Sequence, residues 1–205
     1  MKKTADRSGF EFFPASTERW ADVERLFGKQ GACGGCWCMF WRVPRKQFDA
    51  AKGARNRSAF KKLVDKAPVP PGVLAYCKGE PVGWCAVAPR EHYIGLANSR
   101  ILKPVDDRPV WSISCLFVSR DQRRKGLSAA LLSAATDFAA SHGARIVEGY
   151  PVEPNARMAD AFLWHGVASS FRAAGFKEVL RRSETRPVMR FEVTNASRFS
   201  AAERH

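Results

Sequence analysis

The sequence has no long hydrophobic run, no internal repeat and no low-complexity segment. A basic start, Met1-Lys2-Lys3, leads into Phe10-Glu11-Phe12-Phe13-Pro14, which is far shorter than the apolar core of a signal peptide. No other stretch has the apolar length that spanning a bilayer requires. We therefore expect a cytoplasmic protein that makes no membrane contact.

Cysteine is scarce, with 6 in 205 residues, and this is too few for a disulfide scaffold. Three of the six lie in Cys33-Gly34-Gly35-Cys36-Trp37-Cys38, which contains a CxxC spacing. Structural zinc needs four ligands, but the remaining cysteines stand singly on predicted strands and the histidines form no ligand-spaced pair. We expect packed free thiols and no metal; zinc or redox chemistry is the weaker alternative.

Acidic residues are few: 20 Asp and Glu face 34 Lys and Arg, which gives a net charge of +14. Such an excess favours an anionic partner, which can be nucleic acid, an acidic membrane surface or a phosphate-bearing small molecule. The basic run at 42–66 contains Phe48 and Phe60 as its only aromatic residues and carries no nucleic-acid motif. A solvated helix face is therefore favoured over a nucleic-acid surface.

Hydrophobic periodicity predicts one α/β domain with a core at about residues 10–193 and a flexible basic tail at 194–205. Strands are expected at Phe10–Phe13, Val73–Cys77, Pro81–Val87, Val110–Val118, Ala144–Tyr150, Phe176–Arg182 and Pro187–Val193, and helices around Trp20–Phe27, within 42–66, at Gly126–His142 and at Ala156–Ala174. This order predicts a mixed, mostly antiparallel sheet with helices on both faces.

The segment after the strand at 110–118 carries the clearest chemical signal. A basic turn, with Arg123, Arg124 and Lys125, reaches Gly126, where a helix begins. The first amide N–H groups of a helix have no internal partner and lie at the positive end of its dipole, so they can hold an anion. Taken alone, such a turn is more often a solvated loop.

The turn Arg123-Arg124-Lys125-Gly126-Leu127-Ser128 resembles the acetyl-CoA-binding motif of the GNAT (GCN5-related N-acetyltransferase) superfamily, which is Gln or Arg, two residues, Gly, one residue, then Gly or Ala. Ser128 is a small departure from the last position. Phe171-Arg172-Ala173-Ala174-Gly175-Phe176 is similar to the family's helix that ends in Gly-Phe. The order of elements also matches from Phe10 to Val193, so the chain resembles a bacterial-type member.

The resemblance implies an N-acetyltransferase that moves acetyl from acetyl-CoA to a small-molecule or peptide amine, and a homodimer is compatible with it. CoA would lie where the two central strands splay apart, with its pantetheine arm along Leu116, Phe117 and Val118 and its pyrophosphate on the N–H groups from Arg124 to Ser128. The loop between the first two helices would form a wall of the acceptor pocket, through Trp37, Cys38, Phe40 and Trp41; these aromatic residues can equally belong to the core. The alternatives are a non-catalytic CoA-binding member and a basic nucleic-acid-binding protein.

The family's usual acid and base are missing from this sequence. Ser112 stands where some members carry a glutamate base, and Phe171 replaces the usual tyrosine acid. Alternation places Glu148 and Tyr150 on one face of the strand at 144–150. We hypothesise that Glu148 is the base, acting through water, and that Tyr150 protonates the thiol. An equally weighted alternative pairs Glu148 with an arginine and packs Tyr150 at the strand end.

Overall fold

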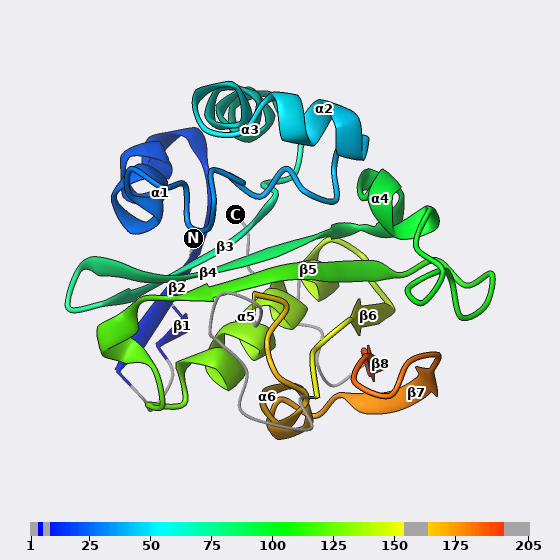
Figure 1. Cartoon of the computed structure of the whole chain (residues 1–205). Coiled ribbons are helices and arrows are strands. Elements are labelled where there is room, and N and C mark those ends of the chain that lie inside the picture. The colour runs from blue at the N-terminus through cyan, green and yellow to red at the C-terminus, as the bar shows by residue number, and fades with distance from the viewer. Residues whose placement is uncertain (1–3, 6–8, 154–163, 195–205) are drawn as a thin grey trace.

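The computed structural model describes residues 4–5, 9–153 and 164–194. In this part of the chain, eight strands form one sheet in the order β1-β2-β3-β4-β5-β6-β8-β7 (Figure 1). The strands are β1 Thr4–Ala5, β2 Phe10–Pro14, β3 Gly72–Cys77, β4 Glu80–Pro89, β5 Trp111–Val118, β6 Ile146–Gly149, β7 Lys177–Arg181 and β8 Pro187–Glu192. Among these eight strands, β5 and β6 are the one pair that is parallel, so the predicted mixed, mostly antiparallel sheet is confirmed.

Helices cover both faces of the sheet (Figure 1). The helical elements are η1 Thr17–Arg19, α1 Trp20–Phe27, α2 Arg45–Ala50, α3 Ala54–Lys66, η2 Arg90–His92, α4 Ile94–Ala97, η3 Arg120–Gln122, α5 Leu127–Ser141 and α6 Ala168–Ala173. Helices α1, α2 and α3 lie on one face, and α5 and α6 lie on the other. Within the described residues, no helix combines the length and apolarity needed to cross a membrane.

The structure differs from the prediction in several segments, including helix α4, which was not expected. The region 42–66 forms two helices, because Gly53 turns the chain with φ +84° and donates its N–H to the carbonyl of Gly35 at 3.0 Å. Strand β1 was not expected. Of the helix predicted at 156–174, the described part is helical only at α6, and 154–163 lies outside the described residues, as does the predicted tail beyond Thr194.

The central strands part after a short pairing. Trp111–Ile113 of β5 pairs with Val147–Gly149 of β6, and then β6 ends while β5 continues to Val118. On the other edge of β5, the register with β4 shifts between Ala86 and Val87, so that Ser114 is the extra residue of a bulge. The splayed strand pair expected for this fold is therefore present, and the bulge lies where the splay begins.

Gly149 ends β6 in close contact with the fully buried ring of Phe171. A Cβ at Gly149 would lie 2.1 Å from Cε1 of that ring, so we expect Gly149→Ala to lower the free energy of unfolding by about 1–3 kcal/mol through overpacking. Urea unfolding measures this loss. Combining it with Phe171→Leu should cost less than the sum of the two single changes, and strict additivity would contradict the contact.

Candidate active site

The turn that follows β5 presents a row of unpaired amide groups. Arg124 and Gly126 have φ values of +62° and +81°, and α5 begins at Leu127 with Gly126 as its N-cap. In the described part of the chain, the backbone N–H groups from Arg124 to Ser128 donate no hydrogen bond. Successive N–H groups with alternating helical and left-handed backbone form a concave anion site. Arg123, Arg124 and Lys125 are exposed beside it, and Nε of Arg123 donates to the carbonyl of Val118 at 3.4 Å.

The predicted pantetheine edge is the part of β5 beyond the splay. Leu116 and Val118 contribute to the core on the α5 side of the sheet, whereas Phe117 packs on the α1 side. The N–H of Leu116 donates to the carbonyl of Trp164 at 2.7 Å. By alternation, Val118 turns its backbone groups to the same side as Leu116. The structure thus brings the three residues to the splay, where Trp164 already holds one of their N–H groups.

A cavity of about 440 Å³ lies beside this part of β5. It is lined by Ala32, Cys33, Gly34, Cys36, Cys38, Phe40, Trp41, Arg45, Phe48, Lys52, Ser114, Cys115, Phe117 and Trp164. Three of the four residues predicted for the acceptor pocket, Cys38, Phe40 and Trp41, are among them. A ligand in this cavity would contact β5 directly at the bulge and the splay.

Trp37, the fourth predicted pocket residue, lies in the core. Its ring stacks on Trp20 with centroids 6.1 Å apart and contacts Phe27 at 5.6 Å. The backbone of Trp37 has φ +43°, and the ring packs so closely on Gly31 that a Cβ there would lie 2.3 Å from Nε1. The structure therefore assigns Trp37 to packing, which was the alternative left open by the sequence.

The segment Cys33–Cys38, called the cysteine loop below, forms one wall of the cavity, and its thiols are reduced. All six cysteines are free, and Sγ of Cys38 accepts a hydrogen bond from Nε1 of Trp84 at 2.8 Å. Burial raises the pKa of Cys36 to about 12, and a hydrogen bond with Cys38 together with burial raises the pKa of Cys115 well above its usual value. Among the described residues, no group of three or more His, Cys, Asp or Glu side chains is placed to hold a metal ion.

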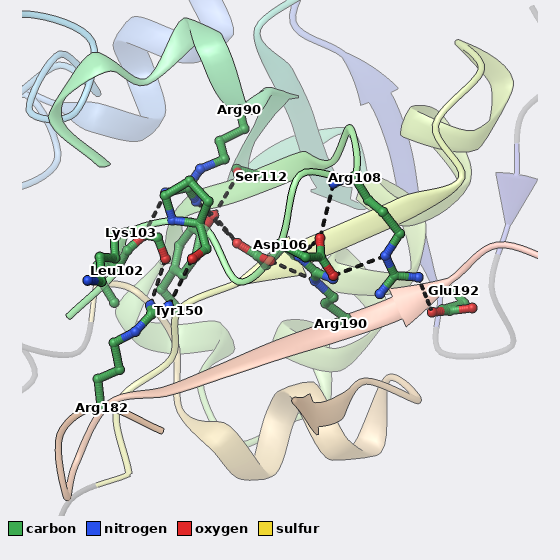
Figure 2. Close-up of polar contacts among 12 residues, drawn as sticks. Arg90, Leu102, Lys103, Asp106, Arg108, Ser112, Tyr150, Arg182, Arg190 and Glu192 are labelled. Atoms are coloured by element: carbon green, nitrogen blue, oxygen red, sulfur yellow. Dashed lines mark hydrogen bonds and ion pairs between the residues drawn. The ribbon is translucent and has the colours of Figure 1, made fainter. Parts of the chain in front are cut away.

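A buried polar cluster joins β5 and β6 next to the splay (Figure 2). The hydroxyl of Tyr150 donates to Oε1 of Glu148 at 2.7 Å and lies 2.7 Å from Oγ of Ser112. Nη1 of Arg90 donates to the same Tyr150 oxygen and, at 3.1 Å, to Oε1 of Glu148. Burial, and then the charge of Glu148, raises the pKa of Tyr150 well above its usual value, so the phenol stays protonated.

The cluster continues onto β8 through Arg190, which lies opposite Glu148 in the strand register. Nε of Arg190 donates to Oε2 of Glu148 at 2.7 Å, and its terminal nitrogens donate to Asp106 at 2.7 and 3.1 Å (Figure 2). The hydrogen bond from Arg190 holds the pKa of Asp106 well below its usual range. The negative charge of Glu148 is thus compensated by ion pairs with Arg90 and Arg190.

The structure brings Glu148 and Tyr150 together but does not bring them to the cavity. Their side chains are 1% and 0% exposed, and neither is among the residues that line it. Both oxygens of Glu148 already accept hydrogen bonds. These contacts favour the alternative in which Glu148 is ion-paired and Tyr150 is packed, and the acid–base assignment stays a prediction.

Sequence reasoning did not single out several groups at the cavity. Ser114 contributes a hydroxyl to the lining of the cavity, and the hydroxyl oxygen of Tyr93 accepts a hydrogen bond from Nη2 of Arg42 at 3.1 Å. Arg45 and Lys52 lie seven positions apart in a run with many basic residues, and Tyr93 lies in a segment that has no strand or helix pattern. No local signal distinguished these residues from solvent-exposed ones.

The sequence matches the model of the acetyltransferase (GNAT) family over residues 37–166, which is more than half of the chain. This range includes the whole of β5 and the amide row at the start of α5. No curated protein matches the sequence.

Solved structures share the fold at low sequence identity. An acetyltransferase of the GNAT family from Listeria monocytogenes has a TM-score of 0.57 at 11% identity, covering 94% of this chain and 100% of that one. A GNAT-family acetyltransferase from Streptococcus agalactiae has a TM-score of 0.54 at 12% identity, covering 91% and 96%. The PaiA N-acetyltransferase from Thermoplasma acidophilum, solved in complex with coenzyme A, has a TM-score of 0.51 at 12% identity, covering 90% and 99%.

Proposed function

Because the chain belongs to the acetyltransferase (GNAT) family, we propose that it transfers an acetyl group from acetyl-CoA to a primary amine. The observation that carries this proposal is the row of unpaired N–H groups from Arg124 to Ser128, at the point where the splayed β5 leads into α5. Amide groups at a helix N-terminus stabilise phosphate through direct hydrogen bonds and the helix dipole.

In this proposal the pyrophosphate of CoA lies on that row, beside Arg123, Arg124 and Lys125. The pantetheine arm follows the β5 edge at Leu116, Phe117 and Val118, and the acetyl end reaches the bulge at Ser114. Because Leu116 already donates to the carbonyl of Trp164, CoA must replace that carbonyl as the partner of the N–H. Binding therefore includes a small displacement of Trp164.

The reaction joins the two ligands where β5 meets the cavity. The neutral amine nitrogen attacks the thioester carbonyl carbon; the C–N bond forms, the C–S bond breaks, and the proton lost by nitrogen ends on the CoA sulfur. Fixing both reactants against one rigid strand supplies much of the rate enhancement. Ser114 is the hydroxyl side chain of β5 that lines the cavity, so it is placed to hydrogen-bond the attacking amine.

The first test is a thermal-shift titration with acetyl-CoA. A ligand that binds only the native state at a hundredfold excess over its Kd adds about 2.7 kcal/mol of stability. For a chain of this size we expect Tm to rise by roughly 5–10 °C. An unchanged Tm at millimolar acetyl-CoA would contradict the proposal, and a shift without amine acetylation would favour the non-catalytic CoA-binding alternative.

Nucleic acid is the weaker alternative, because several cations of the basic run already have acidic partners. Arg45 and Lys52 both pair with Asp49, and Lys61 pairs with Asp65 in the next helix. Binding to DNA that weakens steeply with salt, combined with no response to acetyl-CoA, would reverse this ranking.

A further inference from the structure

The cavity beside β5 has walls that suit an aromatic ligand. The ring of Phe40 packs edge-on against Trp41, Phe48 and Trp164, with centroids 4.8, 5.2 and 5.2 Å apart, and all four residues line the cavity. Its volume of about 440 Å³ is within the range of small-molecule sites. Perpendicular ring edges and faces of this kind favour another aromatic ring over a flexible polar chain.

Among the described residues that line the cavity, the charged ones are the two cations Arg45 and Lys52, and none is Asp or Glu. Both cations pair with the single carboxylate of Asp49, at 2.7 and 2.9 Å, so one positive charge is left without compensation. Asp49 contacts Arg45 through Nε, and the two terminal nitrogens of Arg45 make no hydrogen bond in the described part of the chain. A guanidinium with two free donors is suited to a carboxylate.

Resting on the proposed function, we infer that the acceptor is a small aromatic primary amine that also carries a carboxylate. The aromatic part occupies the ring-lined walls, and the carboxylate faces Arg45 and Lys52. The same charges disfavour polyamines, because a polycation would meet two cations and, among the described lining residues, no acidic side chain.

The test compares four amines in the presence of acetyl-CoA, with the acetylated product measured by mass spectrometry. The probes are L-phenylalanine, L-phenylalaninamide, phenethylamine and spermidine. We expect kcat/KM to be about tenfold or more higher for L-phenylalanine than for either aromatic amine without a carboxylate, and lowest for spermidine. Equal values for L-phenylalanine and phenethylamine, or a preference for spermidine, would overturn the inference.

Arg45→Ala should lower the ratio of kcat/KM for L-phenylalanine to that for phenethylamine by about tenfold. The matched control is Lys46→Ala, which removes an exposed cation of the same helix that does not line the cavity. This control should leave the ratio unchanged. If both variants change it equally, the preference comes from net charge and not from Arg45.

Calorimetric titration of the protein alone with L-phenylalanine and phenethylamine separates this inference from the proposed function. If acetyl-CoA raises Tm but the two amines bind and react equally, the acceptor assignment fails and the acetyl-CoA assignment stands. If L-phenylalanine binds more tightly than phenethylamine but acetyl-CoA has no effect, the cavity assignment stands as a binding site and the transferase proposal fails. If neither acetyl-CoA nor L-phenylalanine binds, the acceptor assignment and the transferase proposal both fail.

Discussion

Glu148→Gln is expected to lower the free energy of unfolding by about 3–5 kcal/mol, because it removes the charge from the centre of a buried ion-pair cluster. The carboxylate is 1% exposed and accepts hydrogen bonds from Arg90, Tyr150 and Arg190. Glutamine has nearly the same shape, but its amide group would place a donor against one of these donors. Two guanidinium groups would then remain buried with too little negative charge.

Urea unfolding measures this change, and thermal unfolding should show a decrease in Tm of roughly 6–20 °C for a protein of this size. Glu192→Gln is the matched control: it makes the same substitution on β8, at a side chain that is 68% exposed and pairs with Arg108 at 3.2 Å. Exposed pairs contribute about 0–1 kcal/mol, so the control should stay near wild type. A loss below about 1 kcal/mol for Glu148→Gln would mean that the cluster is not what stabilises the centre of the sheet.

The same variant tests the predicted acid–base role of Glu148. Assayed well below its Tm, a protein in which Glu148 only positions the strands should keep its pH profile, with a modest change in kcat. If Glu148 is the base, the limb of the profile that reports its ionisation should disappear. Tyr150→Phe tests the predicted role of Tyr150 as proton donor in the same way, because it keeps the ring and removes only the hydroxyl.

The sequence alone was sufficient for the elements whose causes are local. Helix α1 follows from the spacing of Trp20, Val23 and Phe27, which are all buried, and α5 follows from its apolar stripe and the glycine at its start. The hairpin between β3 and β4 follows from Gly79, although Lys78 also adopts a positive φ of +51°. The periods of about 2 residues in a strand and about 3.6 residues in a helix are properties of the amino-acid sequence itself, so they are visible before folding.

The parts that could not be predicted depend on contacts between distant residues. Arg90 and Glu148 are 58 positions apart, and nothing in the pattern around Arg90 distinguishes it from the other 33 cations. The break between α2 and α3 depends on Gly53 approaching Gly35, which is another long-range contact. The cavity is likewise a product of tertiary structure, because its walls come from the cysteine loop, α2, β5 and Trp164.

Ser128→Asp is expected to weaken acetyl-CoA binding by more than about 100-fold without destabilising the protein. Ser128 is the second residue of α5, and the first turn of this helix contains no acidic residue. A carboxylate there interacts favourably with the helix dipole, which adds about 0.3–1 kcal/mol of stability. In the complex, the same carboxylate would lie beside the pyrophosphate. At about 4 Å and an effective dielectric constant near 20, two like charges repel by about 4 kcal/mol.

The substitution is expected to raise the stability of the free protein and to lower its affinity for acetyl-CoA. This combination of effects is specific to an anion site at the start of α5. Calorimetric titration with acetyl-CoA gives the affinity, and urea unfolding of the free protein gives the stability. Ser128→Ala should retain binding, since the pyrophosphate contacts the backbone N–H of this residue and not its hydroxyl. Ser133→Asp places the same charge on an exposed position of α5 and controls for net charge. Both Asp variants lower the net positive charge of the protein by one. The long-range attraction of the protein for the anionic cofactor therefore falls equally in both. Only a pyrophosphate bound at the start of α5 makes Ser128→Asp much worse than Ser133→Asp, and similar affinities for the two would place the cofactor elsewhere.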